Sequence, residues 1–414
     1  MTLKNFLSIK SSVKLGISRI EANYEVMKVS YSALIHSDIQ KKWIEKLDTV
    51  KEQFKDKSDY NDIHSRFPYE NIEWLVNEGY TLLTLPKAYG GEGATIEDMV
   101  IIQSYLGTID GPTALSIGWH LSVVGQLYEQ QMWEPSMLKM FSDEMKNGAL
   151  VNRAISEAET GSPTRGGRPS TNAVEVDDGF VINGVKTFTS MSKGLTHFIV
   201  SAYDTAREQV GYFLIPKETA GVEIADNWNM IGMRATESHD LVLNDVHVSK
   251  SNFVELRSAA GKKPNGWILH IPSVYLGIAQ AARDYAIDFA KAHSPNSIEG
   301  TIGDLSTVQQ NIGKMESLLL SARHFLWSTA ALYTTNDEDT QLWNETAASK
   351  ILVMNQGLEV IDIAMRIVGA KSLEMDRPLQ RYYRDMRAGL HNPPMEDMAY
   401  TNIAASVLGL FDKK

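Results

Sequence analysis

The spacing of apolar residues divides the chain into a helical zone, a β zone and a second helical zone. Up to about residue 150, apolar side chains recur three and four positions apart, as at Trp43, Ile44 and Leu47. This spacing is typical of helices that bury one face. A loop is expected at 83–93, because Pro86 and clustered glycines cannot continue a helix. Helices are expected to resume at 96–105 and 114–128.

Between about residues 150 and 250 the pattern is that of short strands. Apolar runs at 173–176 and 180–182 flank an Asp-Asp-Gly sequence, and Asn183-Gly184 follows. Asp-Gly and Asn-Gly are strong hairpin signals because these residues tolerate positive φ. Several strands with short turns and no helix between them predict an antiparallel sheet or barrel. Further strands are expected at 197–203, 211–215 and 240–248.

The last zone is helical again, with long apolar segments at 268–292, 308–333 and 346–368. These segments are apolar on more than one side, so neighbours must bury them, either in a bundle or across subunits. The clearest case is the third segment, whose apolar residues exceed one stripe: Ile351, Leu352, Met354, Leu358, Ile361 and Ile363.

Composition excludes several classes of protein. The 414 residues include 51 acidic and 40 basic side chains, a net charge of −11, which argues against a nucleic-acid partner. No cysteine is present, so disulfides, iron–sulfur clusters and cysteine nucleophiles are excluded. This fits a reducing compartment, and we expect a cytoplasmic protein. No apolar run approaches the roughly eighteen residues of a membrane span, so no membrane partner is expected.

The common catalytic signatures are also missing. The sequence has no G-x-G-x-x-G, no P-loop, no H-E-x-x-H and no G-x-S-x-G, and its ten histidines show no metal-ligand spacing. A Rossmann dehydrogenase, a P-loop NTPase, a zinc protease and a lipase-type hydrolase are therefore poor candidates, and we expect no metal site.

Six short motifs nevertheless follow one another along the chain: LPKAYGG at 85–91, ISEAETGS at 155–162, GVKTFTS at 184–190, MIGMRAT at 230–236, VLNDVHV at 242–248 and YYRDMR at 382–387. In content and order they resemble the motifs of the acyl-CoA dehydrogenase family. The resemblance extends from about Phe67 to Gly409, and six motifs in order are far more specific than any one. It implies an α+β fold with an N-terminal helical domain (1–149), a central antiparallel β-domain (150–255) and a C-terminal four-helix bundle (256–414).

The resemblance also implies a bound FAD. Phe188 would form a wall against the flavin ring, and Thr189 or Ser190 would donate a hydrogen bond towards its reactive nitrogen. Ile155 and Ser156 would serve the pyrimidine edge. The remaining cofactor residues would be Ser162 near the phosphates, Arg366, which replaces the glutamine of Q-x-x-G-G, and Gly369, which keeps its first glycine. The competing interpretation is that Phe188 is an ordinary core residue of a strand and Ser156 satisfies a turn.

The usual catalytic residues of the family are altered. The glutamate that removes the α-proton of the acyl thioester in most members would fall at or next to Pro393. The position used by a minority of members falls on Trp267, and the arginine that helps to hold the substrate falls on Ile268. The flavin scaffold is thus retained without the standard base.

Three interpretations follow, and we favour the first. The chain could be a divergent acyl-CoA dehydrogenase whose base is Glu396, or its neighbour Asp397, since burial can raise the pKa of a carboxylate towards the working pH. Against this, Glu396 could simply be an acid at a helix N-terminus, where the helix dipole favours it.

The second interpretation is a flavin monooxygenase of the same fold, with His120 and His391 near the flavin to support oxygen chemistry. A lone histidine on a helix is more often structural. The third is a non-catalytic scaffold, with or without flavin, kept for a partner. For the favoured interpretation, the resemblance implies an acyl-CoA or other small-molecule substrate, an electron acceptor and a homotetramer.

Overall fold

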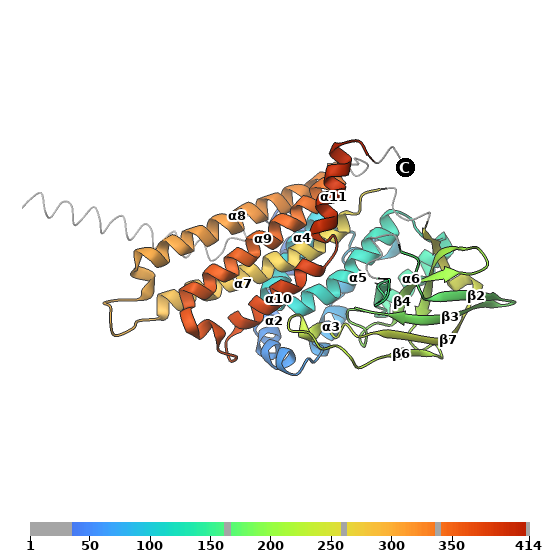
Figure 1. Cartoon of the computed structure of the whole chain (residues 1–414), viewed down its shortest axis with the longest axis horizontal. Helices are drawn as coiled ribbons and strands as arrows, with labels where there is room; N and C mark the ends of the chain where they lie inside the picture. Colours follow the sequence, from blue (N-terminus) through green and yellow to red (C-terminus); the bar gives the residue numbers. More distant parts are fainter. Residues whose placement is uncertain (1–34, 161–166, 258–262, 336–340, 411–414) are drawn as a thin grey trace, which may run out of the picture.

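The computed structural model describes residues 35–160, 167–257, 263–335 and 341–410. Helical segments form an elongated body, and a twisted sheet lies at one end of it (Figure 1). The N-terminal helices are α2 (Asp38–Ile63), α3 (Tyr69–Asn77), α4 (Ile96–Ile109), α5 (Gly111–Glu129) and α6 (Pro135–Lys146).

The expected helices at 96–105 and 114–128 are confirmed as α4 and α5. Thr95 caps α4 by accepting a hydrogen bond from the Asp98 amide, and Asp110 caps α5 in the same way from Thr113. Asp110 therefore ends one helix and begins the next. Both helices are buried on nearly every side, because the remaining helices and the sheet surround them.

The sheet has eight described strands in the order β6-β7-β3-β2-β4-β5-β8, with β1 beside β4. They are β1 (Val151–Ala154), β2 (Asn172–Val176), β3 (Gly179–Lys186), β4 (His197–Asp204), β5 (Gln209–Pro216), β6 (Val222–Ile224), β7 (Leu241–Ser249) and β8 (Phe253–Leu256). Most pairs are antiparallel, as predicted. The exceptions are β1 and β2, which lie along the same edge of β4 and pair with it in parallel.

The predicted hairpin at Asp177-Asp178-Gly179 is confirmed, since β2 and β3 pair directly across it. The second turn signal, Asn183-Gly184, is wrong as a turn and marks a bulge within β3 instead. The register with β7 shifts there. The Asn183 side-chain amide donates to the Asp245 carboxylate and accepts from the Asp245 backbone amide across the shift. Gly184 is required because its φ is +152° and a Cβ would lie within 2.4 Å of the Thr171 hydroxyl.

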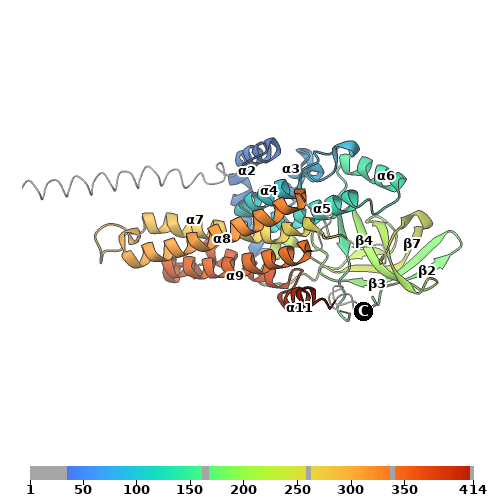
Figure 2. The same cartoon turned by 90° about the horizontal axis from the view of Figure 1, so that it is seen from above.

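The C-terminal helices are α7 (His270–Ala292), α8 (Ser306–Thr335), α9 (Leu342–Val368), α10 (Pro378–Ala388) and α11 (Glu396–Val407), preceded by the 3-10 turn η8 (Gly266–Leu269). Helices α7, α8 and α9 run side by side, and α10 packs along α7 and α9 (Figures 1 and 2). The predicted bundle is therefore confirmed.

Helix α7 also packs closely on α4 from the N-terminal zone. Close approach depends on glycine: a Cβ on Gly107 would lie 2.7 Å from the Val274 carbonyl oxygen, and one on Gly277 would lie 2.3 Å from the Ser104 carbonyl oxygen. The N-terminal helices and the bundle thus share one hydrophobic core.

The apolar residues of α9 are covered largely within the chain. Ile351, Met354, Ile361 and Ile363 are buried, and Leu352 and Leu358 are half-buried. Their abundance therefore reflects packing within the bundle more than an open surface. None of the helices in the described ranges is long and apolar enough to cross a membrane.

Candidate functional site

Two loops that the sequence motifs single out meet at one edge of the sheet. Residues 155–157 follow β1, and residues 187–190 follow β3; we call them the paired loops. The Thr187 amide donates a hydrogen bond to the Ser156 carbonyl at 2.8 Å. The structure thus brings together Ile155, Ser156, Phe188, Thr189 and Ser190, five of the predicted cofactor residues.

Phe188 does not belong to the core. Its side chain is 59% exposed, and its φ is +56°. Among the described aromatic rings, it contacts Trp228, edge to face with the ring centroids 6.0 Å apart. A left-handed conformation is unfavourable for a bulky residue and needs a reason. The alternative of an ordinary strand core residue is therefore wrong, and the exposed ring is free to lie against a flat ligand.

Thr189 and Ser190 offer hydroxyl groups beside that ring. Thr189 is buried, and its Oγ1 has no hydrogen-bond partner within the described residues. Ser190 Oγ accepts a hydrogen bond from Ser238 Oγ at 3.0 Å, and Ser238 lies 2.8 Å from Thr236 Oγ1. A buried hydroxyl without a partner normally has one in the functional state. The exposed ring and this hydroxyl fit a flavin ring with polar atoms along its edge.

A buried ion pair fixes the two loops to each other. Lys186 Nζ lies 2.6 Å from Glu157 Oε1, and the two side chains are 0% and 4% exposed. Glu157 also accepts hydrogen bonds from Thr171 Oγ1 and from the Ser170 amide. Burial acts to raise the pKa of Glu157, but the hydrogen bonds from Lys186 and Thr171 outweigh it and lower that pKa to about 2.

Sequence reasoning overlooked this pair, although both residues lie in the quoted motifs. The available signal was a charged residue adjacent to each loop: Glu157 follows Ser156, and Lys186 precedes Thr187. Charged residues in such settings are usually paired.

His120 is structural. It is fully buried, its Nε2 lies 3.0 Å from the Thr81 carbonyl, and its Nδ1 accepts a hydrogen bond from the Val151 amide at 3.1 Å. Burial lowers its pKa to about 4, so the ring is neutral. Both ring nitrogens are committed to backbone groups, which leaves neither for oxygen chemistry. Instead, His120 fixes α5 to the first residue of β1.

The C-terminal candidates, Glu396 and His391, lie after α10 in the chain. Glu396 begins α11, and its Oε1 accepts a hydrogen bond from Asn355 of α9 at 3.2 Å. It also bonds to Tyr400, one turn further along α11, and this hydrogen bond raises the pKa of the phenol. Within the described ranges, neither Glu396 nor His391 has a hydrogen bond to the paired loops. His391 is exposed, and its neighbour Asn392 accepts a hydrogen bond from Tyr275 at 2.6 Å.

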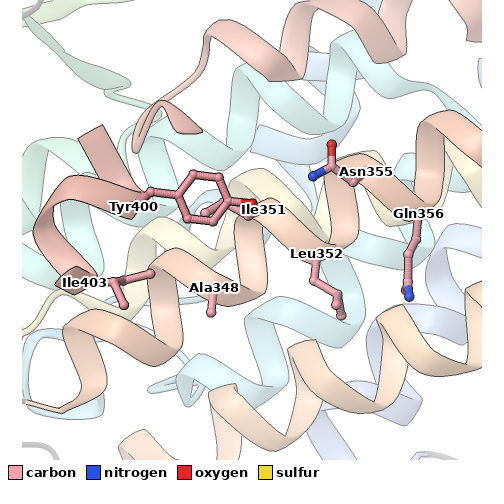
Figure 3. A pocket seen from close by; sticks show the side chains of 7 residues that line it. All are labelled: Ala348, Ile351, Leu352, Asn355, Gln356, Tyr400 and Ile403. Atoms are coloured by element: carbon pink, nitrogen blue, oxygen red, sulfur yellow. The ribbon is translucent and has the colours of Figure 1, made fainter. Parts of the chain in front are cut away.

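Beside Glu396 lies an apolar groove between α9 and α11 (Figure 3). It is lined by Ala348, Ile351, Leu352, Asn355, Gln356, Tyr400 and Ile403. Lys350, 2% exposed, lies on the same helix, and burial lowers its pKa to about 8 while the charge of Glu396 opposes that shift. A lysine of this kind can exchange a proton near neutral pH.

The remaining cofactor predictions are separated from the paired loops. Arg366 and Gly369 are exposed at the C-terminal end of α9, which lies at the end of the bundle away from the sheet (Figure 1). Ser162 lies outside the described residues.

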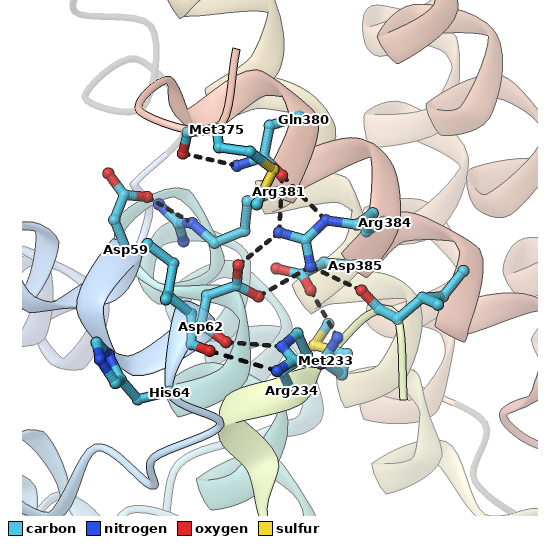
Figure 4. A network of polar contacts seen from close by, with 12 residues as sticks. Asp59, Asp62, His64, Met233, Arg234, Met375, Gln380, Arg381, Arg384 and Asp385 are labelled. Carbon is cyan, nitrogen blue, oxygen red and sulfur yellow. Dashed lines mark hydrogen bonds and ion pairs between the residues drawn. The ribbon is translucent and has the colours of Figure 1, made fainter. Parts of the chain in front are cut away.

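The motifs at 230–236 and 382–387 form a junction between all three zones (Figure 4). Asp385 of α10 accepts a hydrogen bond from the Met233 amide at 2.6 Å, and Arg384 bonds to Asp62 of α2 at 3.0 Å. Arg234 completes it by donating to the Asp62 carbonyl at 2.7 Å. These motif residues hold the sheet, α2 and the bundle together. The described residues include no cluster that could bind a metal ion.

Three domain profiles match the chain in order. They are the N-terminal domain of acyl-CoA dehydrogenase at 44–131, the middle domain at 152–246 and the C-terminal domain at 269–392. The presumed acyl-CoA dehydrogenase YdbM of Bacillus subtilis is 51% identical over 90% of this chain and 98% of its own. Mouse mitochondrial short-chain specific acyl-CoA dehydrogenase is 27% identical, over 78% of each chain.

Solved structures agree on the fold. Butyryl-CoA dehydrogenase of Megasphaera elsdenii superposes with a TM-score of 0.81 at 18% identity, covering 90% of this chain and 99% of the other. KijD3 in complex with FMN and a dTDP-linked amino sugar has a TM-score of 0.80 at 22% identity, covering 91% and 95%. The profiles and the identity to YdbM establish that this chain belongs to the acyl-CoA dehydrogenase family, a family of flavin-binding oxidoreductases.

Proposed function

We propose that the protein is an FAD-dependent dehydrogenase that introduces an α,β double bond into an acyl-CoA thioester. The observation that carries this proposal is the pairing of the two loops, with an exposed Phe188 ring and a Thr189 hydroxyl that has no hydrogen-bond partner among the described residues. When bound, the flavin would accept the hydride that leaves the β-carbon. Phe188 would support the ring, and the hydroxyls of Thr189 and Ser190 would fix its polar edge.

Glu396 is the proposed base for the α-proton. Pro393 and Trp267 stand where the family's two alternative glutamates would fall, so neither position supplies an acid. Glu396 lies in the segment where the usual base is expected, and its Asn355 contact keeps it on α9 in this structure. Catalysis by Glu396 would need that contact to break so that the carboxylate can reach the substrate.

The test is flavin bleaching by acyl-CoA thioesters of graded chain length under anaerobic conditions. Glu396→Gln preserves size and removes the proton acceptor, so bleaching should slow by about a hundredfold or more with flavin content unchanged. Asp397→Asn tests the neighbouring candidate base and should bleach normally if Glu396 is the base. Glu359→Gln, an acid on α9 that pairs with Lys314, is the matched control. An equal rate in Glu396→Gln and the wild type would exclude Glu396 as the base.

The second candidate is a flavin monooxygenase, and the missing acid at positions 267 and 393 is the observation that favours it. Of the two predicted histidines, His120 is bonded to the backbone at both ring nitrogens, so His391 is the candidate for this role. If no acyl-CoA bleaches the flavin, the externally reduced protein should be assayed for oxygenation of aromatic substrates. His391→Ala should then release more hydrogen peroxide than the wild type. A colourless protein that takes up no FAD would favour the scaffold interpretation instead.

A further inference from the structure

A cluster of buried polar groups lies where α4, α5 and the start of α7 meet. Gln103 of α4 and His270 of α7 are both 0% exposed. Five polar atoms there have no hydrogen-bond partner within the described residues. They are the amide nitrogen and oxygen of Gln103, both ring nitrogens of His270, and the indole Nε1 of Trp119. We call these three residues the polar junction.

Two of these side chains, His270 and Gln103, approach α5 at Gly118, and the third, Trp119, is the next residue of α5. A Cβ built on Gly118 would lie 2.6 Å from His270 Nδ1 and 3.5 Å from Gln103 Nε2. The Trp119 and His270 rings meet edge to face with centroids 4.7 Å apart. Gly118 thus permits the imidazole to approach α5, and the amide lies beside it.

The contrast with His120 makes the polar junction exceptional. His120 lies next to Trp119 on the same helix and is equally buried, yet both of its ring nitrogens are bonded. Buried polar groups are nearly always satisfied, and five unpartnered atoms on three neighbouring residues therefore need an explanation.

The polar junction carries no formal charge. Burial lowers the pKa of His270 to about 3, so its ring is neutral and offers one donor and one acceptor. Gln103 adds a donor and an acceptor, and Trp119 adds a donor. The complementary ligand group is therefore neutral and can both donate and accept, which describes a hydroxyl or an amide and excludes a carboxylate or an ammonium.

The polar junction also lies between the two parts of the proposed site. On one side, α5 is fixed to β1 by the His120–Val151 hydrogen bond, and β1 leads directly into Ile155. On the other, Tyr275 of α7 holds Asn392, next to the position where the family's base would fall. The two helices that lead from the polar junction thus connect to the paired loops and to the segment at 390–396.

We propose that Gln103, Trp119 and His270 form a hydrogen-bonding end to the substrate site, so that the enzyme prefers acyl groups ending in a neutral polar group over plain alkyl chains. This inference rests on the proposed function. Within it, the substrate class becomes an acyl thioester with a distal hydroxyl or amide.

The test compares isosteric pairs of ligands of short and medium chain length. One such pair is hydroxypentanoyl-CoA with a terminal hydroxyl and hexanoyl-CoA, which has a methyl group in that place. Dissociation constants are read from the perturbation of the flavin absorbance on binding. The wild type should favour the hydroxyl ligand of the best pair by about tenfold or more, because the alkyl ligand leaves the polar groups unpaired.

Gln103→Met keeps the length of the side chain and removes the amide, and it should abolish most of this preference. It should also leave the ligand-free protein equally or more stable, since the amide has no partner to lose. Ser104→Ala is the matched control: this buried neighbour on α4 bonds only to the Val100 carbonyl in the described hydrogen bonds, and its removal should not change the preference.

The outcomes separate the two proposals. Equal binding of both ligands by the wild type, or an unchanged preference in Gln103→Met, would overturn the polar junction while leaving the dehydrogenase intact. A wild type that holds flavin but binds no acyl-CoA of any kind would overturn both.

Discussion

At the scale of single residues, the Glu157–Lys186 pair is the feature that most directly supports the paired loops. Glu157 follows Ser156 and Lys186 precedes Thr187, so each charged residue is adjacent to one end of the Thr187–Ser156 hydrogen bond. Breaking a buried ion pair by removing one charge leaves the other unpaired and costs about 3–5 kcal/mol. The effect of such a change should therefore appear first in flavin binding.

We predict that Glu157→Gln loses flavin during gel filtration and melts at a lower temperature than the wild type. The double variant Glu157→Gln/Lys186→Met removes both charges and should recover much of the melting temperature, because no buried charge is left unpaired. Flavin absorbance per protein and thermal melts measure both effects. The proposed support would be wrong if Glu157→Gln retained flavin normally.

The pKa of Glu157 gives this pair a pH dependence. Because the folded pKa is lowered to about 2 from an ordinary value near 4.5, the stabilisation is complete above about pH 4.5 and disappears as pH falls towards 2. The contribution of Glu157 to stability is thus constant at neutral pH.

Some site residues could be predicted from sequence and others could not. Phe188, Thr189 and Ser190 could be predicted because they lie within one local sequence motif. The role of Glu157 could not be predicted, because it depends on Lys186 at the end of β3 and on Thr171 just before β2, which the fold brings to it. Glu396 is an intermediate case: its helix position could be predicted, but its contact with Asn355 depends on how α11 packs on α9.

At the scale of elements, α10 connects the helical bundle to α2 and to the loop before β7. Asp385 is buried and its carboxylate accepts the Met233 amide hydrogen bond, while Arg381 and Arg384 of the same helix bond to Asp59 and Asp62 of α2. Burial raises the pKa of Asp385 to about 7, with the charge of Arg381 opposing the shift. The folded protein therefore binds a proton that the unfolded chain has already lost between about pH 4 and 7.

We predict that this carboxyl makes the protein less stable as pH rises from about 4 to 7, because the folded state must then either ionise a buried group or retain the proton. Asp385→Asn is neutral at every pH and keeps an oxygen for the Met233 amide. The melting temperature of Asp385→Asn minus that of the wild type should therefore increase as pH rises from about 4 to 7. Melts between pH 4 and 8 measure it, and a constant difference would contradict the prediction.

The elements themselves were predictable where the signal is local. The hairpin of β2 and β3 and the long helices α7, α8 and α9 follow from turn residues and apolar spacing. The parallel pairing of β1 and β2 with β4 was not predictable, because it depends on which strands the tertiary fold brings together. The bulge at Gly184 was not predictable for the same reason: a flexible pair such as Asn-Gly permits either a turn or a bulge, and the partner strand decides.

At the scale of the whole molecule, the position of Arg366 and Gly369 bears on assembly. They lie at the end of the bundle away from the paired loops. If they contact a flavin, it would therefore be one bound by another subunit. The groove between α9 and α11 presents apolar side chains that this chain does not fully cover. Both observations agree with the expected homotetramer, which remains a prediction.

Light scattering should therefore report a tetramer at micromolar concentration. Leu352→Asp places a charge in the groove and should shift the distribution towards smaller species, because a buried charge at an interface would be unpaired. Lys314→Ala, an exposed position on α8 that pairs with Glu359, serves as the control. A monomeric wild type would contradict the prediction.

The close contact of α4 with α7 has a consequence for how the chain is made. Helix α4 is buried on almost every side, and much of that cover comes from a helix that follows the entire sheet in the sequence. During synthesis, the apolar surface of α4 therefore stays exposed to solvent until the chain beyond Gly277 has left the ribosome. At typical elongation rates this delay is on the order of ten seconds. Chaperones are thus expected to bind the nascent N-terminal half. A chain truncated within the β zone should aggregate instead of forming a folded domain.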